Sequence, residues 1–191
     1  MKTILKFFAI TTLVCCIISC TGNSAKTDDE KFLTYYEKHG YNETPRYQET
    51  IDYSMMLANE SSKINYISIG VSPQGRDIPL LIVDKNGYTS PEKIRNAGRV
   101  ILLAEASIHS GEPDGKDAGL MFIRDIAIFD KYPGILDKVS FLFIPIFNVD
   151  GHEDFGAHYR INQNGPEEVG ARFTAQRYNL IYSVEIGRAH V

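Results

Sequence analysis

The spacing of apolar positions changes along the chain, and these changes predict an alternation of helices and strands. Apolar residues at helical spacing, after a Thr-Pro turn, predict a helix over Tyr47–Asn59. Two short β-rich segments, Lys63–Val71 and Asp77–Asp84, flank the turn sequence Ser-Pro-Gln-Gly-Arg. This arrangement predicts a β-hairpin.

Two nearly continuous apolar segments, Arg99–Ala106 and Phe141–Phe147, follow the hairpin. Such segments are typical of strands buried on both faces of a sheet. Between them, Asp117–Phe129 has the pattern of a helix that is apolar over most of its surface. Strand, helix and strand in this order predict an α/β fold in which helices cover a sheet.

The N-terminus has the pattern of a bacterial export signal. Two lysines precede an apolar segment, Phe7–Ile18, whose 12 residues are fewer than the roughly 20 that a membrane-spanning helix needs. The sequence Ile-Ile-Ser-Cys, which ends at Cys20, resembles the lipobox of bacterial lipoproteins. We therefore expect residues 1–19 to be a lipoprotein signal peptide, Cys20 to be lipidated and residues 20–31 to form a tether. An ordinary cleaved signal with an incidental cysteine is the alternative.

The predicted lipid anchor places the protein outside the cytoplasm, on a bacterial membrane that faces the periplasm or the cell surface. All three cysteines lie in residues 15–20, so the rest of the chain has no disulfide and no cysteine ligand. The apolar fraction of 43% and the charged fraction of 23% are typical of a globular protein and exclude a disordered chain. The formal net charge of −4 gives no indication of nucleic-acid binding.

Candidate chemistry lies in the loop after the first buried strand. His109 and Glu112 are three residues apart, and an imidazole with a carboxylate can bind Zn²⁺. A catalytic zinc takes a third protein ligand, and the alternative is an exposed histidine beside a glutamate at a helix N-terminus. After the second strand, the sequence Asn-Val-Asp-Gly is typical of a turn. Arg160, taken by itself, is expected to be a solvated loop arginine.

Taken in order, these motifs resemble those of the zinc metallocarboxypeptidases (peptidase M14). The ordered set is I-G-V-S-P-Q-G-R-D-I-P-L-L, then I-H-S-G-E, N-V-D-G and R-I-N-Q-N-G-P, and the resemblance covers Thr44–Leu180. It implies a mixed, mostly parallel central sheet covered by helices. It also implies that residues 32–180 are the N-terminal part of a catalytic domain.

The resemblance assigns roles to four side chains. His109 and Glu112 match two zinc ligands, and Arg160 matches the residue that stabilises the oxyanion of the tetrahedral intermediate. Asn179 occupies the position of a residue, usually Asp, that orients the ligand histidine. Gly111 stands where digestive members carry a substrate-contacting arginine, so we expect a different specificity.

The function implied for the complete protein is zinc-dependent removal of C-terminal residues from peptides by a metal-activated water. The substrates expected are exported peptides or cell-wall peptides. Two alternatives stay open: an amidase or deacylase of the same fold, and a surface lipoprotein that binds without catalysis.

The C-terminal residues depart from the family pattern. The third zinc ligand, the general base and the carboxylate-binding residues are expected beyond Leu180, where the resemblance ends. Glu185–Val191 back-translates to GAG ATC GGA AGA GCA CAC GTC, a common sequencing adapter. We therefore interpret residues 181–191 as a suspect, non-native tail and expect the 191-residue chain to be an inactive fragment.

Overall fold

The computed structural model describes residues 30–160 and 165–180. The chain divides into two compact units, residues 1–33 and residues 34–191. Of the first unit, only Glu30–Leu33 is described, and its Leu33 N–H donates to the Glu30 carbonyl at 3.3 Å. All the elements below belong to the second unit.

Several sequence predictions fall outside the described residues. These are the signal peptide 1–19, the lipidation of Cys20, the tether 20–31 up to residue 29, and the tail 181–191. Within the part that the structure describes, no helix combines the length and the apolar character needed to cross a membrane.

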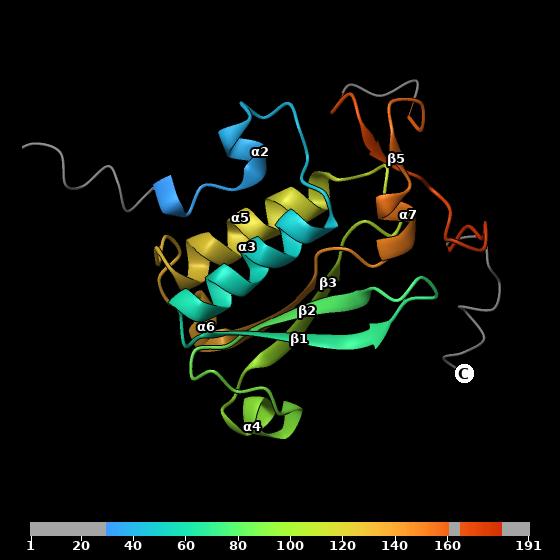
Figure 1. The fold of residues 1–191 in the computed structure, drawn as a ribbon. Helices are drawn as coiled ribbons and strands as arrows, with labels where there is room; N and C mark the ends of the chain where they lie inside the picture. The colour runs from blue at the N-terminus through green and yellow to red at the C-terminus, as the bar shows by residue number, and fades with distance from the viewer. Residues whose placement is uncertain (1–29, 161–164, 181–191) are drawn as a thin grey trace, which may run out of the picture. The chain divides into compact units, whose positions relative to one another are not determined.

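The helices and strands alternate along the second unit (Figure 1). The helices are α2 (Tyr35–Lys38), α3 (Tyr47–Glu60), α4 (Pro91–Asn96), α5 (Asp114–Ala127), α6 (Ile135–Lys138) and α7 (Val149–Glu153). The strands are β1 (Ile64–Val71), β2 (Asp77–Val83), β3 (Val100–Glu105), β4 (Val139–Ile144), β5 (Phe155–Gly156) and β6 (Val169–Gly170).

The main sheet has the strand order β1-β2-β4-β3. β1 and β2 form the predicted antiparallel hairpin, β2 and β4 are also antiparallel, and β3 and β4 are parallel. The predicted α/β fold with a mixed sheet is therefore confirmed. The expectation of a mostly parallel sheet does not hold for these four strands, because two of their three pairings are antiparallel. β5 and β6 form a separate two-stranded sheet.

The predicted elements form, with shifted ends that have local causes. α5 begins at Asp114, directly after Pro113, so it starts three residues before the predicted helix. β4 ends at Ile144, ahead of Pro145, because proline has no N–H to donate to a strand ladder. The strand therefore ends earlier than the predicted Phe141–Phe147, and it also begins two residues earlier, at Val139.

Helices α3 and α5 lie side by side over one face of the main sheet (Figure 1). The buried residues of α5 include Leu120, Ile123 and Ile126. The helix approaches β4 so closely that a Cβ at Gly119 would lie 2.1 Å from the Phe143 ring. This close packing fixes the start of α5, and hence the loop before it, relative to the ends of the strands.

The expectation that Arg99–Ala106 is buried on both faces is wrong. β3 lies at one edge of the described sheet, and Val100, Leu102 and Leu103 are 66%, 52% and 52% exposed. Because neighbouring residues of a strand point to opposite faces, both faces are open at Leu102 and Leu103. The strands with a neighbour on each side are β2 and β4, and most residues of both are buried, so the predicted burial of the second apolar segment, Phe141–Phe147, is confirmed for its strand β4.

We expect the apolar edge strand β3 to cause self-association, because an exposed, hydrophobic edge strand offers unpaired backbone groups to another chain. Leu103→Lys should therefore shift the 21.5 kDa chain toward monomer in sedimentation experiments. Val71→Lys is the matched control, because Val71 is 66% exposed on the opposite edge strand, β1. An equal shift with both variants would indicate a general solubility effect instead.

Candidate metal centre

His109 and Glu112 lie in the loop that joins β3 to α5, at the carboxyl end of the strand, where open α/β sheets place their sites. Ser107, with a positive φ of 51°, turns the chain out of β3 just before His109. The His109 ring is 3% exposed, and its Nδ1 lies 3.4 Å from Oε1 of Glu112. A cavity of about 280 Å³ opens here, lined by residues 105–109 with Glu112, Asp114 and Gly115.

Asn179 holds the opposite side of the His109 ring. His109 Nε2 lies 3.0 Å from Oδ1 of Asn179, 70 residues further along the chain. An amide oxygen can only accept, so this contact needs a hydrogen on Nε2, and a neutral ring then has its lone pair on Nδ1, on the side of Glu112. The structure thus brings together two side chains that the family resemblance had paired, in the tautomer that a metal-binding histidine needs.

The distance between Nδ1 of His109 and Oε1 of Glu112 fits two ligand atoms of one zinc ion. At Zn–N and Zn–O distances of about 2.0–2.2 Å, two tetrahedral ligands lie about 3.3–3.6 Å apart. The observed separation of 3.4 Å between Nδ1 and Oε1 falls in this range. In the described part of the chain, no group of three or more His, Cys, Asp or Glu side chains could hold a metal. His109 and Glu112 are thus candidates for two of the three protein ligands that a catalytic zinc requires.

Two arginines converge on the same carboxylate oxygen. Arg160, in the turn after β5, donates from Nη2 to Oε1 of Glu112 at 2.6 Å. Arg172, two residues after β6, donates from Nη1 to that oxygen at 3.4 Å. The sequence predicted a functional role for Arg160 through the motif R-x-N, whose Asn162 lies outside the described residues. Nothing in the sequence pattern indicated Arg172, because its position depends on how β6 pairs with β5.

Two glycines, Gly111 and Gly170, allow the loop after β3 to pack closely against the segments of Arg160 and β6. A Cβ at Gly111 would lie 2.8 Å from Cγ of Arg160 and 3.0 Å from the Gly170 carbonyl. A Cβ at Gly170 would lie 2.7 Å from Cβ of Ser110. The missing side chain of Gly111 thus leaves the space that the Arg160 side chain occupies.

The sequence Asn-Val-Asp-Gly forms the start of helix α7 and ties it to the hairpin. Asn148 caps the helix by accepting the Gly151 N–H at 3.1 Å. The buried Asp150 carboxylate accepts from Ser72 Oγ at 2.7 Å, from Arg76 Nη1 at 2.8 Å and from the Gln74 N–H at 3.2 Å. The turn chemistry was visible in the sequence, whereas this link across more than 70 residues was not.

A buried polar chain joins α5 to α7. Lys116 is fully buried, and its Nζ donates to the Pro45 carbonyl at 2.5 Å and to His152 Nε2 at 3.1 Å. His152 Nδ1 then donates to Oε1 of Glu153 at 3.2 Å, and the same oxygen accepts the Tyr47 N–H. Burial lowers the pKa of Lys116 to about 8. Burial first, and then the Lys116 charge, lowers the pKa of His152 to about 4.

We expect stability to fall as the pH is lowered from 6.5 to 4. His152 is neutral in the folded state down to a pKa of about 4, against 6.5 for an ordinary histidine. Its stabilising contribution is therefore complete above pH 6.5 and lost as the pH falls to 4, a change of about 3 kcal/mol. Urea unfolding across this range should show a weaker pH dependence for His152→Gln. His158→Gln, at an exposed position, should behave as wild type.

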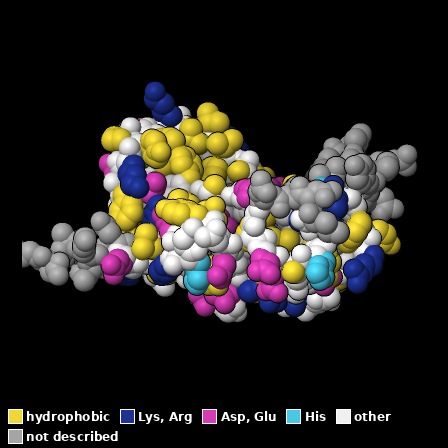
Figure 2. Space-filling view, turned by 90° about the horizontal axis from the view of Figure 1, so that it is seen from above, with side chains coloured by type: hydrophobic (Ala, Val, Ile, Leu, Met, Phe, Trp, Pro, Cys, Tyr) yellow, Lys and Arg dark blue, Asp and Glu magenta, His cyan; other side chains and the backbone are white. Residues whose placement is uncertain are grey.

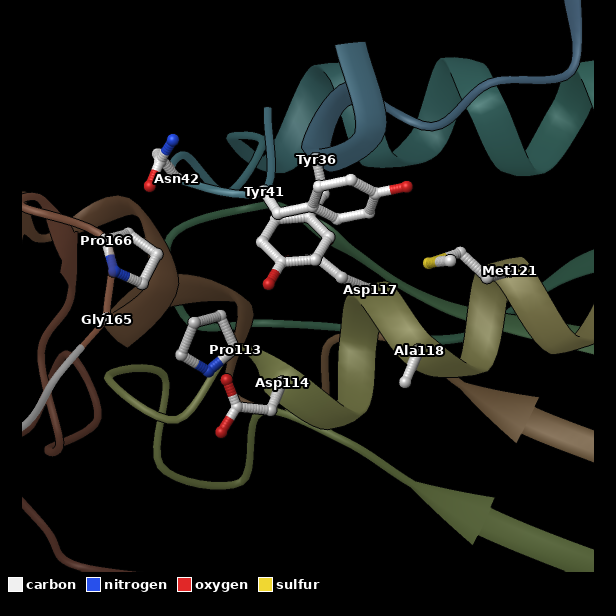
Figure 3. A pocket seen from close by; sticks show the side chains of 10 residues that line it. All are labelled: Tyr36, Tyr41, Asn42, Pro113, Asp114, Asp117, Ala118, Met121, Gly165 and Pro166. Carbon is white, nitrogen blue, oxygen red and sulfur yellow. The ribbon is translucent and has the colours of Figure 1, made fainter. Parts of the chain in front are cut away.

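A second cavity, of about 510 Å³, lies beside the first turns of α5 (Figure 3). Tyr36 comes from α2, and Tyr41 follows that helix, with their ring centroids 5.2 Å apart. Asp114 and Asp117 are the charged residues that line it. None of the described residues that line this cavity is a histidine, in contrast to the candidate metal centre.

The chain belongs to the zinc carboxypeptidase family, peptidase M14, which matches residues 50–179. This match confirms the resemblance drawn from the ordered motifs. The match includes His109, Glu112, Arg160 and Asn179, although it does not test their individual roles. No curated protein sequence matches the chain.

Solved structures of the same class have a similar fold. The carboxypeptidase A from Helicoverpa armigera has 19% sequence identity and a TM-score of 0.52, over 68% of this chain and 33% of that chain. A metallo-carboxypeptidase from Burkholderia cenocepacia has 18% identity and a TM-score of 0.50, over 70% of this chain and 31% of that chain. The chain thus spans about a third of the length of these proteins. At such identities the likeness concerns the fold.

Proposed function

We propose that the complete protein is a zinc-dependent hydrolase that removes C-terminal residues from peptides. The single observation that carries this proposal is the pairing of His109 Nδ1 with Glu112 Oε1, 3.4 Å apart, at the carboxyl end of β3. Membership of the zinc carboxypeptidase family supports it, because this family is zinc-dependent in general. His109 and Glu112 would hold the ion, and a third ligand comes from outside the described residues.

The residues around the pair have distinct tasks in this proposal. Zinc, when bound, polarises the scissile carbonyl and activates a water. Asn179 keeps the hydrogen of His109 on Nε2 and so leaves Nδ1 as a ligand atom. Arg160, whose guanidinium lies at the candidate ligand Glu112, supplies positive charge where the oxyanion develops.

We also propose that the protein acts outside the cytoplasm, anchored to a bacterial membrane through a lipid on Cys20. The signal-like residues 1–19 support this proposal. Peptides or cell-wall peptides are then the accessible substrates. On the face that Figure 2 shows, Lys and Arg side chains are scattered among acidic ones, which argues against a nucleic-acid partner.

The proposed function is tested with the complete protein, purified with and without added zinc. Zinc analysis should give about one ion per chain, as a mononuclear catalytic site requires. Peptides with a free C-terminus should lose their last residue, whereas the same peptides with an amidated C-terminus should be cleaved far more slowly. Equal cleavage of both forms would contradict exopeptidase action and would favour an amidase instead.

A further inference from the structure

Arg172 lies at the candidate metal centre without a role in the proposed reaction. Its Nη1 reaches Oε1 of Glu112 at 3.4 Å, the oxygen that also accepts from Arg160 at 2.6 Å. The Arg160 and Arg172 side chains are 19% and 30% exposed, whereas Glu112 is 47% exposed. Two guanidinium groups thus face the same carboxylate oxygen here.

The contact with Glu112 does not by itself account for the position of Arg172. A single long contact to a half-exposed carboxylate contributes little to stability, and it orders a long side chain at an entropic cost. A guanidinium has five N–H donors in a planar fork that matches a carboxylate. Within the part of the chain that the structure describes, Glu112 is the one side-chain acceptor of Arg172. The N–H groups of Arg172 that do not reach Glu112 have the geometry to donate to a bound oxyanion.

Charges of opposite sign flank the His109–Glu112 pair. The cavity at His109 is lined on the β3 and α5 side by Glu105 and Asp114. The arginines approach Glu112 from the segments that follow β5 and β6. An anionic group of a substrate is therefore attracted on the Arg172 side and repelled on the Glu105 side.

We propose that Arg172 selects substrates that carry an acidic side chain on a residue flanking the amide bond to be cleaved. The carboxylate of that side chain, aspartate or glutamate, binds the guanidinium of Arg172, while Arg160 stays at the scissile carbonyl. This inference rests on the proposed peptide hydrolase function and names its substrate class. Arg172 is a specificity-determining residue in this view.

The test uses the complete protein and peptide pairs that differ only by Glu or Gln, at the C-terminal residue or at the one before it. In one of the two pairs, wild type should cleave the Glu peptide with a kcat/KM at least about tenfold higher than that of the matching Gln peptide. This ratio is the effect of one charge-assisted hydrogen bond. Arg172→Gln should lower the Glu-to-Gln ratio of kcat/KM about tenfold, to near one, because the side-chain carboxylate of the substrate then loses its charged partner. Arg172→Lys should keep part of the preference.

Arg177→Gln is the matched control, because Arg177 is 74% exposed and lies 3.6 Å from Asp154, not at Glu112. It should retain the wild-type preference. An equal loss on both peptides with Arg172→Gln, or no preference in wild type, would overturn the inference and leave the proposed function intact.

Hydrolysis of no peptide at all would contradict the proposed function rather than the inference. The inference is then decided by calorimetric titration with N-acetyl-L-glutamate and N-acetyl-L-glutamine. Two results together support the inference. The N-acetyl-L-glutamate binds more tightly than the N-acetyl-L-glutamine, and Arg172→Gln weakens the binding of the glutamate about tenfold, as expected for the loss of one charge-assisted hydrogen bond. Absence of glutamate binding, or binding that Arg172→Gln leaves unchanged, overturns it. Thermal unfolding of each variant verifies that it is folded.

Discussion

His109→Ala in the complete protein is expected to abolish both zinc binding and peptide hydrolysis. The substitution removes Nδ1, one of the two candidate ligand atoms. Nδ1 lies 3.4 Å from Oε1 of Glu112, a separation that fits two ligands of one zinc ion. Since carbonyl polarisation and water activation both depend on the ion, kcat/KM should fall by about 10³-fold or more. Metal analysis after dialysis should find zinc in wild type and not in the variant.

A graded variant and a control sharpen this experiment. Asn179→Ala leaves both ligand atoms in place but removes the acceptor for His109 Nε2, so zinc affinity should fall by about 10–100-fold. His158→Ala, at an exposed position, should retain zinc and activity. Stoichiometric zinc in His109→Ala would place the metal elsewhere in the protein.

Arg99→Met is expected to destabilise the fold by about 3 kcal/mol or more, because it leaves a buried carboxylate without its charged partner. Asp84 is fully buried, and Arg99 donates to it twice, from Nε at 2.9 Å and from Nη2 at 3.1 Å. Ser140 Oγ also donates to this carboxylate. The Asp84–Arg99 ion pair thus joins the end of β2 to the start of β3, and Ser140 links it to β4. Urea unfolding at pH 7 measures the loss.

Arg95→Met provides the control for this prediction. Arg95 is 61% exposed and lies 4.0 Å from Glu92, so its loss should change the unfolding free energy by less than about 0.5 kcal/mol. Combining Arg99→Met with Asp84→Asn should cost less than the sum of the two single changes, because the unpaired charge is then absent. A loss below about 1 kcal/mol for Arg99→Met would show that Asp84 is compensated by its other donors.

The elements that the sequence predicted correctly are those with a strong local pattern. The helix over Tyr47–Asn59 and the hairpin around Ser-Pro-Gln-Gly-Arg are set by periodicity and turn chemistry within a few residues. The loop of His109 and Glu112 was visible because both side chains lie within one short segment. The family resemblance added Arg160 and Asn179, which local spacing alone did not distinguish from ordinary loop residues.

Burial of β3 was predicted wrongly because an apolar strand does not specify its neighbours. Val100, Leu102 and Leu103 have the composition of a central strand, yet the described sheet ends at β3. The strands paired on both sides are β2, between β1 and β4, and β4, between β2 and β3.

By itself, the sequence determined the order of helices and strands, the α/β class and the candidate zinc ligands, because these depend on interactions between near neighbours and on ordered motifs. Only the tertiary structure decided which strands lie inside the sheet, that Asn179 contacts Nε2 of His109 and that Arg172 reaches Glu112. Those contacts join residues 60 and 70 positions apart, and their geometry depends on how separate loops pack together. The physical reason is that long-range contacts arise from strand pairing and close glycine packing, which no local pattern encodes.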